Sequence, residues 1–128
     1  MFGLRYCSSS GVIVSTGMGS TGWFRSLMSG AIGVVGASTS TIAQLREDGF
    51  PWEAEQLYFT VREPFPSRTT QAELVFGEIR ADEPLRIVSQ MPDYGVIFSD
   101  GIENDFLQFN SGMEATIGLS DRRGHLVQ

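Results

Sequence analysis

The residues best suited to chemistry lie in one short stretch, Gly11–Trp23, where a β-branched run is followed by glycines and hydroxyl-bearing residues. Glycine lets the backbone bend sharply and approach a ligand closely. The free N–H groups at the start of a helix favour a bound anion. One hydroxyl suffices to cap a helix, yet five surround this bend: Ser15, Thr16, Ser20, Thr21 and Ser26. The stretch therefore predicts a cradle for a phosphate or a ribose.

The run Gly17–Gly22 also has the G-x-G-x-x-G spacing of dinucleotide-binding turns. That fingerprint requires a returning parallel strand that ends in an acid about 20 residues later. Glu47 and Asp48 follow no convincing strand, and no further alternation of strands and helices follows. A Rossmann fold is therefore excluded, and a tight strand-to-helix turn that binds nothing stays open as the alternative.

Composition narrows the classes of function. The 128 residues carry a formal charge of −6, which argues against nucleic acid or an anionic membrane as a partner. All nine basic residues are arginine, so no P-loop lysine, kinase strand lysine or Schiff base is available. Cys7 is the only cysteine, and no apolar run reaches the length of a membrane span. We expect one domain over 1–128, located in a reducing cytoplasm.

Two helices and a series of strands are expected to position the bend. One helix begins at Trp23 and ends near Ser29 or Gly30, and a second begins near Thr41, whose spacing to Gln44 is that of a capping box. The segment 31–37 could continue the helical structure or form a Gly-rich buried connection, and the sequence does not separate these two interpretations. Strands are expected at 2–6, 11–15, 57–61, 73–79, 85–91, 95–98, 106–109, 115–119 and 125–127.

The turns between the later strands recur every 8–12 residues, which is typical of antiparallel sandwiches and barrels. The fold class expected is mainly β with one or two short helices, arranged as an antiparallel β-sandwich. Because the chain opens on a strand and hairpin, an exposed sheet edge is expected, and with it a homo-oligomer.

The segment Val12–Trp23 resembles the Val-Ser-Thr-Pro-Thr-Gly-Ser-Thr-Ala-Tyr signature of NAD kinases. The run Gly95–Gly101 is similar to the Asp-Gly turn between the last strands of that family. The likeness extends from Ser8 to the end of the chain and is weak between Gly30 and Phe76. It implies a β-rich, NAD-binding C-terminal domain of a two-domain kinase, whose N-terminal nucleotide-binding lobe is absent here.

The resemblance implies a set of NAD-binding residues. Thr21, Gly22, Trp23 and Ser26 match positions that hold the dinucleotide, while Gly19 and Ser20 match the turn itself. Trp23 stands where the family has Tyr, Gly17-Met18 replaces Pro-Thr, and Ser10 replaces an NAD-contacting Asp.

The catalytic motifs of that family are missing from these 128 residues. Neither the Gly-Gly-Asp-Gly loop, whose Asp activates the ribose 2′-hydroxyl, nor the Asn-Glu/Asp pair is present. In the full family protein ATP with Mg²⁺ would phosphorylate the 2′-hydroxyl of NAD. We expect the 128-residue chain alone to bind nucleotide without turnover, and we assign it no catalytic residue.

Two other classes of function stay open. The chain could be a non-catalytic β-domain that binds a nucleotide or assembles with itself, or a kinase relative that acts on a sugar or lipid hydroxyl. The acids Asp93, Asp100, Glu103 and Asp105 fit no EF-hand loop, so no metal site is assigned. His125 and the pair Arg122-Arg123 are expected to be exposed and receive no role.

Overall fold

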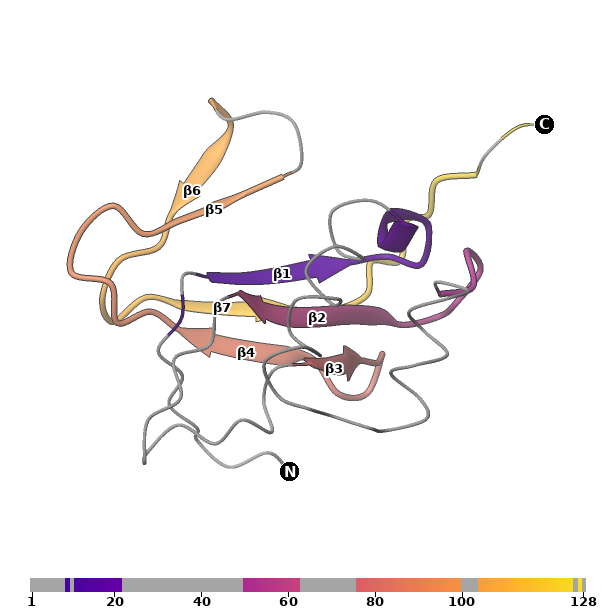
Figure 1. Ribbon diagram of the computed structural model, residues 1–128, viewed down its shortest axis with the longest axis horizontal. Coiled ribbons are helices and arrows are strands. Elements are labelled where there is room, and N and C mark those ends of the chain that lie inside the picture. Colours follow the sequence, from indigo (N-terminus) through magenta and orange to yellow (C-terminus); the bar gives the residue numbers. More distant parts are fainter. Residues whose placement is uncertain are drawn as a thin grey trace.

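A computed structural model describes residues 9, 11–21, 50–62, 76–99, 104–125 and 127. Within these ranges the chain is mainly β, and its helical content is one short 3₁₀ turn. The strands form three antiparallel sheets, in the orders β1-β2-β3, β4-β7 and β5-β6 (Figure 1). The mainly β, antiparallel character expected from the sequence is confirmed. The two helices expected after Trp23 and Thr41 lie outside the described residues.

The three-stranded sheet is built around β2 (Leu57–Arg62), which pairs with β1 (Gly11–Ser15) on one side and β3 (Phe76–Ile79) on the other. Its aromatic and β-branched residues suit a pleated surface buried on both faces. Tyr58 and Thr60 are buried on one face of the strand, and Val61 is buried on the other. This strand therefore carries the centre of the core.

An aromatic ring covers the glycine in β3. Phe59 lies directly opposite Gly77 in the register, and a Cβ atom added to Gly77 would overlap the Phe59 ring. Glycine weakens a strand because it offers no side chain to pack. The ring of the neighbouring strand supplies that packing here, which explains how an interior glycine is tolerated.

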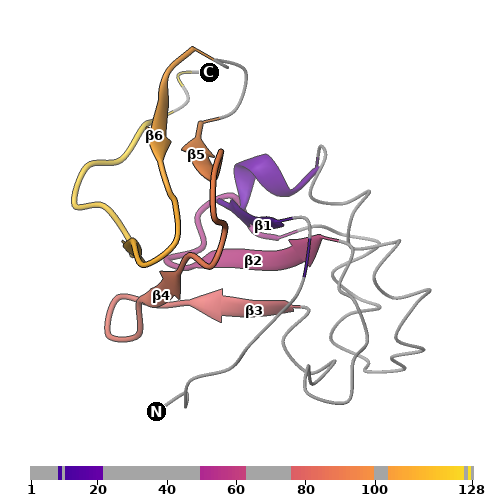
Figure 2. The ribbon, with the colours of Figure 1, turned by 90° about the vertical axis from the view of Figure 1, so that its left-hand side faces the viewer.

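A long irregular ribbon forms the rest of the described chain. It begins with β4 (Leu85–Val88) paired to β7 (Glu114–Ile117) and ends with the hairpin of β5 (Val96–Phe98) and β6 (Phe106–Gln108). The β4–β7 pair lies behind the three-stranded sheet in Figure 1 and to its left in Figure 2. The β5–β6 hairpin projects away from both, at the top of Figure 2.

Hydrogen bonds between the two chain segments carry the ribbon across its bend. The Ser89 N–H donates to the Met113 carbonyl at 2.9 Å, and the Phe109 N–H donates to the Gly95 carbonyl at 2.7 Å. The buried Ser89 hydroxyl donates to the Phe109 carbonyl and accepts from the Met91 N–H. These hydrogen bonds join the two chain segments that connect the hairpin to β4 and β7, so the hairpin is fixed relative to those strands.

Several strand boundaries differ from those expected. The strand beginning at Leu85 ends at Val88, not at residue 91, because the pairing becomes irregular at Ser89. The Ser89 N–H donates to the Met113 carbonyl, whereas the Ser89 carbonyl accepts from the Gly112 N–H. The last pairing strand begins at Glu114 and ends at Ile117, one residue before Gly118. His125 and Val127 belong to no strand, so the final strand expected over 125–127 is wrong at both ends. The strand expected at 2–6 lies outside the described residues.

Candidate functional site: the turn after β1

Pairing with β2 holds the hydroxyl-rich bend at one end of the three-stranded sheet. Ser15, the last residue of β1, lies opposite Tyr58 near the beginning of β2. The chain then turns through Thr16 and Gly17 into the 3₁₀ helix η1 (Met18–Thr21). Where the sequence predicted a turn feeding a longer helix, the described part is this single helical turn at the right of Figure 1.

Two of the five hydroxyls serve the turn itself. The Thr16 Oγ1 accepts a hydrogen bond from the Gly19 N–H at 3.2 Å, in the manner of an N-cap. The Ser15 Oγ donates to the Thr16 carbonyl at 2.9 Å. Ser15 and Thr16 therefore shape the backbone, which leaves Ser20, Thr21 and Ser26 as the hydroxyls predicted to meet a ligand.

Gly17 and Gly19 differ in how strictly the turn requires a glycine. A Cβ atom on the buried Gly17 would overlap the Pro51 carbonyl oxygen, so this residue must be glycine for the segment before β2 to pack against the turn. A Cβ atom on Gly19 would lie 2.8 Å from the Ser15 Oγ. Because that oxygen belongs to a side chain that can rotate, the contact does not by itself require a glycine at Gly19, a predicted NAD contact.

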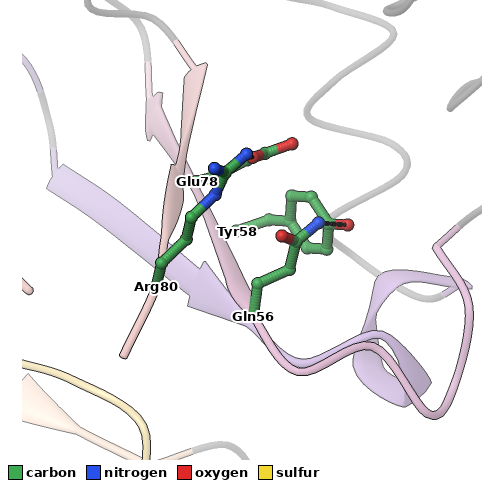
Figure 3. A network of polar contacts seen from close by, with 4 residues as sticks. All are labelled: Gln56, Tyr58, Glu78 and Arg80. Carbon is green, nitrogen blue, oxygen red and sulfur yellow. Dashed lines mark hydrogen bonds and ion pairs between the residues drawn. The ribbon is translucent and has the colours of Figure 1, made fainter. Parts of the chain in front are cut away.

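The segment before β2 forms the floor beside the turn. The rings of Phe50 and Tyr58 stack with their centroids 3.4 Å apart and their planes 7° from parallel, and both residues are buried. The Gln56 Nε2 donates to the Tyr58 hydroxyl at 2.5 Å (Figure 3). The sequence motifs gave no signal for these residues, because their proximity to the turn arises from the pairing of β1 with β2 and from the contact of Pro51 with Gly17.

Two ion pairs involve the end of β3 and the segment before β2. The Arg80 Nη2 lies 2.8 Å from the Glu78 Oε2, and this hydrogen-bonded carboxylate raises the pKa of the Arg80 guanidinium (Figure 3). The Arg123 Nη1 lies 3.1 Å from the Glu55 Oε1, in the segment before β2. Of the two arginines that received no role, Arg123 joins distant parts of the chain.

The structure describes only some of the predicted NAD-binding residues. Gly19, Ser20 and Thr21 lie together in η1, where the structure describes the backbone of Ser20 and Thr21. Gly22, Trp23 and Ser26 lie outside the described residues. The arrangement described is a backbone bend after a strand, and its binding role stays a prediction.

Comparison with family models, with curated proteins and with solved structures finds no match to this chain. Across the described ranges, no helix is long and apolar enough to cross a membrane. The same ranges contain no group of three or more His, Cys, Asp or Glu side chains arranged to hold a metal ion.

Proposed function

We propose that this chain is the NAD-binding, β-rich part of an NAD kinase-like protein of the cytoplasm, with the turn after β1 gripping the dinucleotide. The observation that carries the proposal is the run Val12–Trp23, whose likeness to the NAD kinase signature includes a strand followed at once by a Gly-Ser-Thr bend. The antiparallel sheets fit the β-rich domain that this family implies, and a β-sandwich is part of the proposal.

The chemistry assigned to the complete protein is phosphoryl transfer. The 2′-hydroxyl oxygen of NAD would attack the γ-phosphorus of ATP, the bond to the β-phosphate oxygen would break, and ADP would leave. The hydroxyl proton needs an acceptor, and phosphate clamping with Mg²⁺ is the usual requirement. Because the 128 residues contain no Gly-Gly-Asp-Gly loop, the chain supplies the acceptor cradle without the base.

A titration of NAD into the chain tests the cradle. We expect saturable heat for the unmodified chain and at least a tenfold loss of affinity for Thr21→Arg, because the resemblance assigns Thr21 to the dinucleotide and a large cation at that position would obstruct binding. Gln90→Arg is the matched control, since it adds the same charge at an exposed position of the ribbon and should bind NAD normally. With ATP and Mg²⁺ added, no ADP should form.

Each failure has a distinct meaning. Equal heats for the chain and for Thr21→Arg, or no heat at all, would favour a β-domain that serves assembly only, which the free edges of β1 and β3 among the described strands also favour. Saturable binding of a sugar or of a lipid hydroxyl compound in place of NAD would favour a kinase relative with another acceptor. Clear ADP formation would contradict the expectation that the chain lacks a catalytic base.

A further inference from the structure

The β5–β6 hairpin is apolar on both of its faces. The register places Val96, Phe98 and Phe106 on one face and Ile97 with Leu107 on the other. These five side chains are between 36% and 68% exposed. An isolated two-stranded hairpin is marginally stable in water, and clustered apolar exposure marks interaction sites. The hairpin therefore presents an exposed apolar surface of the kind that binds a partner.

The base of the hairpin is held in place. The Gly95 N–H donates to the Asn110 Oδ1 at 3.0 Å, and the Gly95 carbonyl accepts from the Phe109 N–H. Tyr94, the residue before, has a φ of 62° and a side chain that is 94% exposed. A non-glycine residue keeps such a left-handed conformation only where its surroundings impose it. The exposed Tyr94 ring is thus displayed by the bend.

The base of the hairpin is also hollowed. An open depression of about 350 Å³ lies between Asp93, Val96 and Phe106. Both outer edges of the hairpin are free of a partner strand among the described strands. An extended segment could pair with either edge through its backbone, while its side chains reach the apolar faces and the depression.

Charge indicates the kind of segment. Asp93, Asp100, Glu103 and Asp105 fall within or beside the hairpin sequence, and no Lys, Arg or His occurs between residues 87 and 121. Asp93 and Asp105 are exposed. A second copy docked through the same patch would bring two such acidic sets together, and like charges across an interface are costly. A basic partner would be attracted instead.

We propose that the β5–β6 hairpin docks a partner protein by pairing with an extended segment in which apolar side chains alternate with arginine or lysine. Because side chains alternate between the two faces of a strand, the apolar residues of that segment would lie beside one face of the hairpin. Its cations, on the other face, would be attracted to acids such as the exposed Asp93 and Asp105. The proposal does not depend on nucleotide binding at the turn after β1.

The test uses a fluorescein-labelled, acetylated hexapeptide of alternating Arg and Val, with a Glu and Val peptide of equal length as its counterpart. Anisotropy titrations should show at least tenfold tighter binding of the Arg peptide. Asp105→Asn should weaken that binding severalfold and reduce its salt dependence, whereas Asp121→Asn, at an exposed site far along the chain, should leave it unchanged.

A second pair of variants tests the apolar contribution. Leu107→Ser should lower the affinity for the Arg peptide at least fivefold, and Val127→Ser, which alters a side chain 91% exposed near the C-terminus, should not. Circular dichroism confirms that each variant is folded.

Three results would overturn the proposal. Equal binding of the Arg and Glu peptides, or no binding of either, would contradict the proposal that the partner segment is basic. If Val127→Ser lost as much affinity for the Arg peptide as Leu107→Ser, the hairpin would not be the binding site. Sedimentation showing a dimer of the chain that Leu107→Ser dissociates would assign the hairpin to a second copy instead.

Discussion

Thr16 shows how a hydroxyl in the candidate site can have a structural task. Its Oγ1 accepts from the Gly19 N–H, so it satisfies a donor that the short η1 turn leaves unpaired. The neighbouring Ser15 hydroxyl is likewise directed at backbone, toward the Thr16 carbonyl. A count of hydroxyls in a sequence therefore overstates the number available to a ligand.

We expect Thr16→Val to lower the free energy of unfolding by about 1 kcal/mol, the usual cost of removing an N-cap hydroxyl. Valine has nearly the same shape as threonine, so the loss isolates the hydrogen bond. Urea unfolding measures it, and Thr16→Ser, which keeps the acceptor, should retain most of the stability. Equal midpoints for Thr16→Val and the unmodified chain would show that the cap contributes nothing.

At the scale of the element, the bend at Ser89 and Gly95 decides where the ribbon changes direction. A Cβ atom at Gly95 would overlap the Phe109 carbonyl oxygen, while the backbone N–H and carbonyl of Gly95 are both hydrogen-bonded. A glycine is required here because a side chain would have no space beside the Phe109 backbone, and not because Gly95 has an unusual φ.

Gly95→Ala is accordingly expected to destabilise the chain by about 1–3 kcal/mol, the range found when a methyl group is forced into a filled site. Gly124→Ala is the matched control, since nothing lies within 4 Å of a Cβ atom built there. Chemical denaturation of both variants makes the comparison. If Gly95→Ala were as stable as Gly124→Ala, the bend would have to move aside without cost.

For the whole molecule, charge is unevenly distributed along the chain. The net charge is −6, and the arginine-free stretch 87–121 includes the whole β5–β6 hairpin. The ion pairs Arg80–Glu78, Arg86–Glu114 and Arg123–Glu55 are exposed. Exposed pairs contribute little, so repulsion among the acids is expected to outweigh them.

Raising NaCl from roughly 0.05 to 0.5 M shortens the Debye length from more than 10 Å to a few ångströms and screens that repulsion. The melting temperature should therefore rise with salt, as followed by scanning fluorimetry. Replacing NaCl by sodium sulfate would add exclusion from the surface, so chloride is the cleaner choice. A melting temperature that falls with salt would mean that the ion pairs dominate.

Much of the strand sequence could be predicted because its signals are local. The run 11–15 is β-branched, and residues 57–62 combine aromatic and β-branched types. The bend at Ser89 could not be predicted in this way, because its hydroxyl bonds to Phe109, 20 residues later in the chain. Strand ends depend on such distant partners, and so the end at Val88 was missed.

By itself the sequence determined that the chain is mainly β, where most strands lie, and that a glycine- and hydroxyl-rich bend follows the strand Gly11–Ser15. Only the tertiary structure decided that this strand pairs with β2, more than 40 residues away, and that β5–β6 is nested within β4–β7. It also decided that Pro51 packs on Gly17 and that Thr16 caps the turn. The physical reason is that propensity acts on neighbours along the chain, whereas pairing and packing depend on contacts between residues far apart in sequence.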